Sequence, residues 1–380
     1  MKKQKIFAIS VGRSDYDRYY PILDALQKRK NVSLSLVVTE SHSNPIYGKT
    51  INFIEKKFNI FKNNYKKYNS NNLVEIFARD LIFLNQLILK YKPNKIIVLG
   101  DRYEMLIGPI TAIPYNIPII HFFGGAVTLG ATDELVRHAI TKMSHFHFPL
   151  INDYRKRILQ LGEEEWRIKS IGMHELSHFK KSVIEKKILN KILNFNFNLP
   201  FILFTFHPTT LELKQLNYQI ENLIQAVKSS KLNAVITYPN ADPKNQKIIR
   251  QINKKFKDKK KYIVIKNCGK EIYASFLKYC LFVIGNSSSG IVEAASFHKP
   301  AINIGSRQEG KLKPKNVISC DYNQRSIKRA IEKALKKSFV KKISKFKNPY
   351  EEKVKLKKVI DMIVSIKNND KILRKKFKNK

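Results

Sequence analysis

Short apolar runs alternate with longer amphipathic segments along the chain, and the alternation forms two series. In the first series the runs that predict strands are Lys5–Gly12, Leu34–Glu40, Lys95–Asp101, Pro118–Gly125, His145–Leu150 and Arg167–Met173. In the second series they are Phe201–Pro208, Ala234–Asn240, Tyr262–Asn267, Leu281–Asn286, Pro300–Gly305 and Val317–Tyr322. Most runs are continuous in Val, Ile and Phe, which is typical of strands buried on both faces of a parallel sheet.

The segments between these runs predict helices. Leu73–Tyr91 has apolar residues at helical spacing, and Glu104–Tyr115 follows the third predicted strand. Alternating strands and helices imply right-handed crossover connections and a fold of the α/β class. Two series of this kind therefore predict two Rossmann-like domains.

The join between the two domains is expected in the polar segment Lys180–Leu199, which is rich in Lys and Asn. We accordingly predict an N-terminal domain over residues 1–185 and a C-terminal domain over 186–349. Residues 350–380 are predicted to form a helix that crosses back to the first domain, followed by a basic tail.

The net charge is strongly positive, and the type of basic residue decides how it is interpreted. The 380 residues include 72 Lys and Arg against 30 Asp and Glu, a formal charge of +42. Such an excess is typical of proteins that bind nucleic acids or anionic membranes. Here only 14 of the basic residues are Arg, and the lysines are spread along the whole chain. We expect a solvated surface that attracts anionic small molecules, with no nucleic-acid and no membrane partner.

Cysteine content and hydropathy indicate the compartment. Cys268, Cys280 and Cys320 form no CxxC motif, which fits a reduced, cytoplasmic environment. The N-terminal apolar run is short and polar residues follow it, so it predicts a strand rather than a signal peptide. No apolar segment reaches the roughly 18 residues that a membrane span needs.

Ligands of open parallel sheets bind beyond the carboxyl ends of the strands, so the residues after each predicted strand are the candidates for chemistry. The turn GRSDY after the first strand lacks a GxGxxG motif, so no dinucleotide cofactor is expected, and its Arg13 suits a phosphate. His42 follows the second strand. Asp101 and Arg102 follow the third, where Asp101 is either a catalytic acid or the cap of the next helix.

A charged segment after the fourth strand, DELVRH, contains Asp133, Glu134 and Arg137. On a helix, Asp133 and Arg137 stand four residues apart, so they are either site residues or a structural ion pair. His145 and His147 share one face of the next predicted strand, but no third ligand stands at a spacing familiar from metal sites. We therefore predict no metal site.

The second series carries its own candidates at the strand ends. They are His207, Asn286, Ser287, Ser288, Glu293 and Arg307. The hydroxyl and N–H groups of the GNSSSG segment suit a diphosphate, and the glutamate one turn later suits ribose hydroxyls. Arginine is the rarer base in this chain, yet four arginines fall in strand-end segments of the two series. That placement favours bidentate contacts with phosphate or carboxylate groups.

Taken together, these segments resemble the hydrolysing UDP-N-acetylglucosamine 2-epimerases, which supply N-acetylmannosamine or related sugars for sialic-acid-like nonulosonic acids. The resemblance covers about residues 5–350 and rests on VGRSDY, LGDRYEML, IPIIHFFGG, DELVRHAITKMSHFHF, FHP, IGNSSSGIVEAA and INIGSRQEG. It implies a GT-B-like fold with the active site in the interdomain cleft, and a homo-oligomer. It also implies an enzyme of the glycosyl hydrolase class that acts on a UDP-sugar and needs no cofactor.

The resemblance implies roles for the nucleotide-binding residues by matching position. Ser287 and Ser288 would bind the diphosphate, with Glu293 on the ribose. Arg13 and Arg307 would contact the nucleotide.

The resemblance also assigns the residues around the sugar. Asp101 and Asp133 match the catalytic carboxylates, His42 matches a sugar-site histidine, and His207 would lie near the diphosphate or the sugar. The implied chemistry removes the C2 proton with anti-elimination of UDP, through a glycal-type intermediate. Water then adds and releases the free 2-epimerised sugar.

One stretch departs from the family pattern. Family members usually read HIEGGE or HIHGGE where this chain has HFFGGA at residues 121–126. Phe123 replaces a catalytic acid proposed for many members, and Ala126 replaces the acid after the glycines. A less polar wall of this kind is expected to raise the pKa of a remaining carboxyl group, Asp101 or Asp133. It also suits a sugar that lacks a hydroxyl, such as a diacetamido-trideoxy analogue.

The departure leaves alternatives open. Glu134 or Glu104 is a candidate to replace the missing acid. A GT-B glycosyltransferase would keep the UDP-sugar site and use an acceptor in place of water, and a pseudoenzyme would bind the nucleotide sugar without turnover. The charge alone would also fit a nucleic-acid binder.

Overall fold

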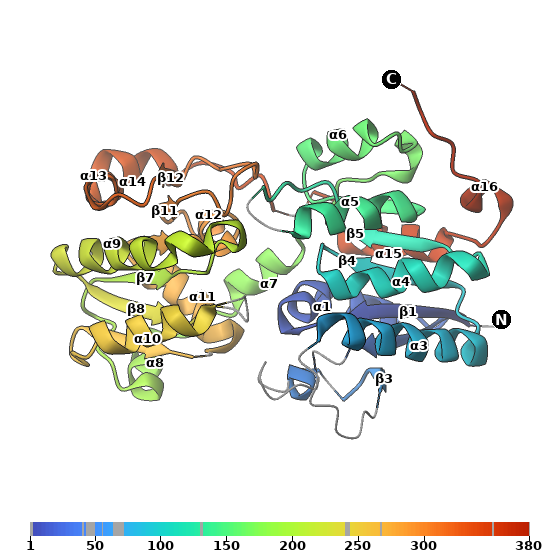
Figure 1. The fold of residues 1–380 in the computed structure, drawn as a ribbon, viewed down its shortest axis with the longest axis horizontal. Helices are drawn as coiled ribbons and strands as arrows, with labels where there is room; N and C mark the ends of the chain where they lie inside the picture. Colours follow the sequence, from blue (N-terminus) through green and yellow to red (C-terminus); the bar gives the residue numbers. More distant parts are fainter. Residues whose placement is uncertain are drawn as a thin grey trace. The chain divides into compact units, whose positions relative to one another are not determined.

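The computed structural model describes residues 3–39, 42, 50–54, 56–63, 72–129, 132–239, 244–266, 268–351 and 353–379. It divides into two compact units. The first unit comprises Met1–Ala126, Asp133–Glu175 and Glu352–Lys380, and the second comprises Val127–Thr132 and Leu176–Glu351. Each is built on a parallel sheet with helices on both faces (Figure 1).

The first unit contains a six-stranded sheet in the order β3-β2-β1-β4-β5-β6, and every described strand pair in it is parallel. The strands are β1 (Gln4–Ser10), β2 (Val32–Val38), β3 (Asn59–Lys62), β4 (Lys95–Leu99), β5 (Ile119–Phe122) and β6 (Phe146–Phe148). The helices are α1 (Arg13–Gln27), η2 (Thr50–Phe53), α3 (Leu73–Tyr91), η3 (Tyr103–Leu106), α4 (Ile107–Ala112), η4 (Ile113–Tyr115), α5 (Asp133–Met143), α6 (Asn152–Gln160), η5 (Glu165–Arg167), α15 (Leu356–Ser365) and α16 (Asp370–Leu373).

Five of the six strands predicted in the first series are confirmed, and the sixth is wrong. The predicted strand Arg167–Met173 instead begins in the 3-10 turn η5 and contains only isolated bridge residues, Ile168, which pairs with His147, and Met173. The sixth strand of the sheet is β3, which the sequence analysis missed. Its four residues, NIFK, are exposed or half-buried at the sheet edge, so they lack the continuous apolar pattern of a buried strand.

The second unit repeats the topology of the first. Its sheet has the order β12-β11-β10-β7-β8-β9, again with parallel pairs, and all six predicted strands are confirmed. The strands are β7 (Phe201–Thr205), β8 (Asn233–Thr237), β9 (Tyr262–Ile265), β10 (Val283–Gly285), β11 (Ala301–Ile304) and β12 (Val317–Cys320). The helices are α7 (Glu175–Lys181), α8 (Lys186–Leu193), η6 (Thr210–Gln215), α9 (Leu216–Ser229), α10 (Asn245–Lys255), α11 (Gly269–Tyr279), η7 (Ser288–Gly290), α12 (Glu293–Ser296), α13 (Gln324–Leu335) and α14 (Lys337–Ile343).

The core of the second unit consists of two apolar layers, one on each face of the sheet. One layer joins α9, α10 and α13 to the strands, and the other joins α8 and α11. The segment Lys180–Leu199, expected at the domain join, contributes Leu189, Phe195 and Phe197 to the second layer. It is therefore part of the second unit, whose main segment begins at Leu176.

The C-terminal segment belongs to the first unit. Helix α15 packs against α1, and Lys95 at the start of β4 donates hydrogen bonds to the carbonyls of Ile363 (2.8 Å) and Ile366. The buried Arg167 donates to the carbonyl of Ile372 in α16 (2.8 Å). These contacts satisfy carbonyl groups at the ends of short helices, which would otherwise lose their hydrogen bonds on burial.

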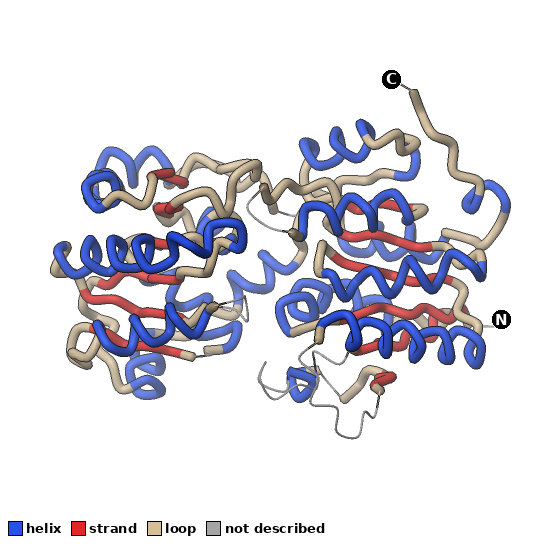
Figure 2. The backbone as a smooth tube through the Cα atoms, viewed as in Figure 1, coloured by secondary structure: helices blue, strands red, loops and turns tan. Residues whose placement is uncertain are grey.

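Both sheets change winding direction at one place, between β1 and β4 in the first unit and between β7 and β10 in the second. Figure 2 shows the strands of each unit with helices around them. The chain leaves the two neighbouring strands toward opposite sides, so side chains after them can gather at one edge. The candidate residues come from the segments around these two edges. Among the described residues, none of the helices has both the length and the apolar character to cross a bilayer.

Candidate active site

Arg137 organises the sheet edge of the first unit. Its side chain is fully buried, and it donates a hydrogen bond from Nε to Asp101 Oδ2 (3.0 Å) and a second from Nη2 to the same oxygen. Nη1 donates to the Ala126 carbonyl (2.9 Å) and to Glu134 Oε2. A buried guanidinium is stable only when it is paired and hydrogen-bonded, and two carboxylates meet that need here.

The contacts of Arg137 decide two questions that the sequence left open. Asp101 does not cap the next helix, because Arg102 holds the position before η3 and no side chain caps that turn. The described ion pairs of Arg137 run to Asp101 and Glu134 rather than to Asp133. Both hydrogen bonds that Arg137 donates to Asp101 favour a carboxylate at this position.

The other charged residues at this edge have defined surroundings. Asp133 is the first residue of α5 and is half-buried. Glu134 accepts from Arg137 and also contacts His138 Nε2 (2.9 Å). Arg102 is about half exposed and pairs with Glu104 (3.1 Å), so both lie beside Asp101 at the end of β4.

Phe123 replaces a polar side chain with part of an aromatic cluster. It is 7% exposed, it has a φ of +65°, and its ring lies 6.2 Å from that of Phe122. Phe122 stacks on Phe148 (4.8 Å) and meets the ring of Tyr19 edge-on (6.3 Å). The wall of the edge is therefore apolar at this point, as the sequence predicts.

His121, just before this wall, supports the backbone. It is fully buried, its Nε2 is 2.8 Å from the Gly100 carbonyl, and its Nδ1 is 3.2 Å from Thr141 Oγ1. Burial lowers the pKa of His121 to about 3, so the ring is neutral and its Nε2–H donates to the carbonyl. This bond fixes the Gly100 turn that leads into Asp101.

Asp15 belongs to the same edge, and the sequence analysis gave it no role. It lies in the first turn of α1, is 7% exposed, and its Oδ2 has no hydrogen-bond partner within the described part of the chain. Burial raises the pKa of Asp15 to about 7, against the opposing effect of Arg102 and Arg18. The only sequence signal was its place after the first strand, in the turn GRSDY.

The remaining candidates of the first unit are His42 and Arg13. His42 is fully buried after β2, and its Nε2 is 2.9 Å from Ser10 Oγ at the end of β1. It therefore lies at the same sheet edge as Asp101. Arg13 begins α1, and its side chain lies outside the described part of the structure.

Asn286 is the residue that joins the strand-end segments of the second unit. It is fully buried, its Oδ1 accepts from the His207 amide (2.7 Å), and its Nδ2 donates to the His207 carbonyl (2.8 Å). The Asn286 carbonyl accepts from Gln308 Nε2 (2.9 Å) and from Arg307 Nη1 (3.3 Å). Asn286 thus joins the segments after β7, β10 and β11 and brings His207 and Arg307 to one edge.

The serine-rich segment follows directly. Ser287 caps η7, accepting from the Ser289 amide (3.3 Å), and Ser288 is half-buried in that turn. The segment leads into two short turns, η7 and α12, and not into one long helix. Gly285 is required before it: φ is +137°, and a Cβ would lie 1.8 Å from the Thr205 carbonyl oxygen.

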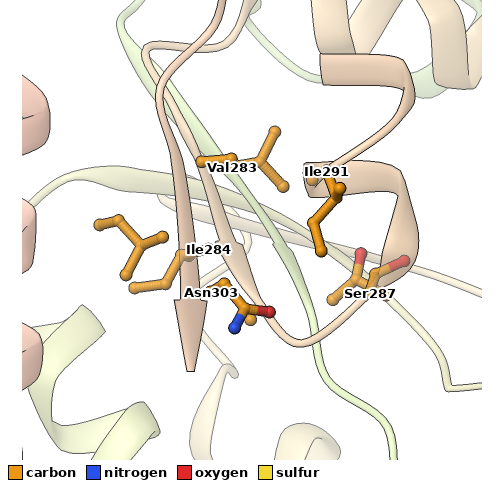
Figure 3. A pocket seen from close by; sticks show the side chains of 10 residues that line it. Val283, Ile284, Ser287, Ile291 and Asn303 are labelled. Atoms are coloured by element: carbon orange, nitrogen blue, oxygen red, sulfur yellow. The ribbon is translucent and has the colours of Figure 1, made fainter. Parts of the chain in front are cut away.

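A narrow space of about 10 Å³ lies behind this turn, bordered by Val283, Ser287, Ile291 and Asn303 among others (Figure 3). It holds about one water molecule and is far too small for a nucleotide. This space is therefore not the site of a nucleotide.

The last two residues of this edge are His207 and Glu293. His207 is 4% exposed, and burial, reinforced by Arg307, lowers its pKa well below the ordinary value, so the ring is neutral. Glu293 begins α12, and its Oε2 is buried without a hydrogen-bond partner in the described residues. An unsatisfied buried acceptor of this kind suits a donor from a ligand hydroxyl.

His145 and His147 face different partners. His145 Nδ1 accepts from the Ile119 amide (3.1 Å), while His147 Nε2 is 3.1 Å from Glu163 Oε2. Across the described ranges, no group of three His, Cys, Asp or Glu side chains is arranged to hold a metal ion.

Comparison with known proteins identifies the family. The family model described as UDP-N-acetylglucosamine 2-epimerase matches residues 24–364. The chain is 35% identical to a Campylobacter jejuni protein named GDP/UDP-N,N'-diacetylbacillosamine 2-epimerase (hydrolyzing), over 99% of both chains. It is 29% identical to the UDP-N,N'-diacetylbacillosamine 2-epimerase (hydrolyzing) of Legionella pneumophila, over 98% of both. The chain therefore belongs to the UDP-N-acetylglucosamine 2-epimerase family.

The fold matches solved structures of the same group. One is the UDP-GlcNAc 2-epimerase of Neisseria meningitidis bound to UDP-GlcNAc, with a TM-score of 0.81 and 16% identity over 96% of this chain and 100% of that one. The two Rossmann-like units are thus those of a GT-B-like fold, as the sequence predicts.

Replacing Asn286 tests whether one amide joins the three strand-end segments. Asn286→Ala leaves a buried backbone N–H and C=O of His207 unpaired, so we expect the free energy of unfolding to fall by roughly 2–4 kcal/mol. Urea denaturation followed by circular dichroism measures the change. Asn217, exposed on α9, provides the control: Asn217→Ala should alter stability by less than about 0.5 kcal/mol. Equal effects of the two substitutions would contradict the organising role.

Proposed function

We propose that the protein is a hydrolysing 2-epimerase of a UDP-2-acetamido sugar, which releases UDP and the free 2-epimerised sugar. The observation that carries the proposal is the pair of strand-end clusters, one anchored by Arg137 and one by Asn286. Each occurs where an open parallel sheet binds its ligand. Family membership supports the same reaction.

In this proposal the second unit binds the nucleotide. Ser287 and Ser288 offer hydroxyl and amide groups to the diphosphate, and Arg307 supplies a positive charge for the leaving group. Glu293 accepts hydrogen bonds from the ribose through its unsatisfied oxygen. From the first unit, Arg13 contributes a second cation to the nucleotide.

The first unit acts on the sugar. The ionised Asp101 accepts the C2 proton, and the electron pair of that bond forms the C1–C2 double bond as the C1–O bond to UDP breaks. Water then supplies the C1 hydroxyl, so a glycosyl–phosphate bond is hydrolysed. Asp133 and Glu134, at the start of α5, are the other carboxylates of this edge, and Arg102 and Arg137 stabilise the negative charges. The two buried histidines, His42 and His207, orient the sugar and its leaving group.

The substrate is proposed to be a sugar that lacks a hydroxyl, such as a 2,4-diacetamido-2,4,6-trideoxyhexose. A hydroxyl facing Phe123 would lose its hydrogen bonds, whereas a methyl or an acetamido methyl group would pack there. Relatives named diacetylbacillosamine 2-epimerases support this choice. The free product then supplies nonulosonic acid synthesis.

Ser288→Ala tests nucleotide binding. Loss of a charge-assisted hydrogen bond to the diphosphate should weaken UDP affinity by about 1–2 kcal/mol, measured by calorimetry on the folded variant. Ser319→Ala, at an exposed position of β12, serves as the control and should bind UDP normally. Unchanged affinity in Ser288→Ala would remove Ser288 from the site.

Asp101→Asn tests the base. The amide retains the shape of the carboxylate but cannot take a proton, so turnover should fall about 100-fold or more, while UDP affinity barely changes. UDP release and sugar release are measured together by mass spectrometry. Near-normal turnover would reduce Asp101 to a structural partner of Arg137.

A substrate panel tests the reaction and its specificity together. Wild type should release UDP and free sugar without an added acceptor, with kcat/KM at least about tenfold higher for the UDP-diacetamido-trideoxy sugar than for UDP-N-acetylglucosamine. Phe123→Glu should reduce this ratio. UDP release that needs an acceptor would indicate a glycosyltransferase, and tight UDP binding without turnover would indicate a pseudoenzyme. A tenfold preference for UDP-N-acetylglucosamine would refute the pocket argument.

A further inference from the structure

We propose that Asp15 is the proton donor of this site, delivering a proton to C2 of the unsaturated intermediate in place of the acid that Phe123 removes. The inference rests on the proposed function and adds one catalytic residue to it. It follows from the position of Asp15, from its burial and from the stereochemistry of 2-epimerisation.

Asp15 and Asp101 belong to the same sheet edge. Strand β1 pairs with β4, with Ile6 opposite Lys95 and Ala8 opposite Ile97. Asp15 follows the end of β1 by five residues, and Asp101 follows the end of β4 by two. The side chain of Asp15 therefore comes to the switch point at which the first unit gathers its charged groups.

Epimerisation at C2 needs two groups in different protonation states. The proton leaves from one face of the sugar and returns on the other, so the group that removes it cannot restore it. The first group must begin ionised and the second protonated. Enzymes usually meet this need with two carboxyl groups whose different surroundings give them different pKa values.

The surroundings of the two aspartates differ in this way. Asp101 accepts two hydrogen bonds from a buried arginine, which favours the carboxylate. Asp15 is buried with one oxygen unpartnered among the described residues, which favours the neutral acid. Burial raises the pKa of Asp15 to about 7, and the negative charge of Asp101 acts in the same direction.

The groups that act on Asp15 come from two elements of the edge. Those on α1 are Arg18 and Tyr19, and those after β4 are Asp101, Arg102 and Glu104. Arg102 and Arg18 favour the ionised form, whereas Asp101 and Glu104 oppose it, so burial remains the largest effect. Tyr19 lies one helical turn beyond Asp15 and contacts Phe122, which links Asp15 to the apolar wall.

The proton balance of the reaction is complete with these groups. Asp101 takes the C2 proton as UDP leaves with the electron pair of the C1–O bond. Asp15 then gives its proton to C2 on the opposite face while the oxygen of water bonds to C1 and releases a proton to solvent. Asp101 afterwards loses its proton and Asp15 regains one, so each turnover releases one proton in all.

Asp15→Asn is the decisive substitution, because an amide mimics the neutral acid in shape and charge but cannot supply the proton. We expect formation of the free 2-epimerised sugar to fall at least about 100-fold, and UDP release to fall less. The unsaturated sugar, one water lighter than the product, should accumulate and be visible by mass spectrometry. Asp15→Glu, which keeps an acid, should retain a measurable part of the sugar release.

The pH profile provides a second readout. Wild-type kcat should decline above about pH 7 as Asp15 ionises, and Asp15→Asn should lose this decline in its residual activity. Asp24→Asn is the control, because Asp24 lies on the same helix but pairs with Lys28 and Lys57. It should retain wild-type activity and the wild-type pH profile.

Stability tests the protonation state without any substrate. Because Asp15 holds its proton more tightly in the folded state, wild-type stability should fall as pH rises from about 4 to 7, relative to Asp15→Asn. The difference in melting temperature should widen over this range and be constant above it. A difference that does not change with pH would show that Asp15 is ionised in the fold, and the inference would be wrong.

The outcomes separate this inference from the proposed function. Should wild type release no UDP from any sugar nucleotide, both fail. Should wild type turn over and Asp15→Asn form free sugar at the same rate, only the role of Asp15 fails.

Discussion

The sheet edge of the first unit depends on the neutralisation of one buried charge. Arg137 has no exposed surface, so folding must bring acceptors to it, and Asp101, Glu134 and the Ala126 carbonyl come from three different segments. Removing any one of them would leave part of a guanidinium unpaired in a medium of low polarity, at a cost of several kcal/mol. The position of Asp101, the carboxylate proposed to be catalytic, is therefore a consequence of charge compensation. The ion pair that stabilises the fold therefore also fixes the position of the Asp101 carboxylate.

In the second unit a neutral side chain, Asn286, holds the strand-end segments together. Asn286 satisfies both backbone groups of His207 and receives bonds from the segment after β11. Its carboxamide carries no charge at any physiological pH, which suits an edge proposed to bind an anion. An ionised anchor such as Arg137 would compete with the ligand, or pair with it too strongly to release it.

The sequence predicts the fold well because its information is local. Strands such as FILFT and AVIT are apolar on both faces, and that pattern identifies a parallel sheet without knowledge of tertiary contacts. It fails at β3, an exposed edge strand, and at Arg167–Met173, whose alternating apolar and polar residues make only isolated bridges and no regular ladder. The pairing of Arg137 with Asp101, 36 residues away, and the burial of Asp15 beside the end of β4 depend on packing between segments that are distant in the sequence. No local pattern contains that information, so the sequence could name the residues of the turn GRSDY without finding the one that becomes buried.

The discontinuity of the first unit has a consequence for how the chain is made. The second unit is almost continuous in sequence, whereas the first needs α15, which packs on α1 and receives Lys95 at its carbonyl end. During synthesis the last strand of the N-terminal sheet, β6, ends at Phe148, and roughly 200 further residues follow before α15 begins at Leu356. The polar end of Lys95 and the apolar face of α1 remain uncovered throughout that interval. The first unit can therefore complete its packing only after the second unit has been synthesised, and until then its uncovered apolar surface is open to aggregation.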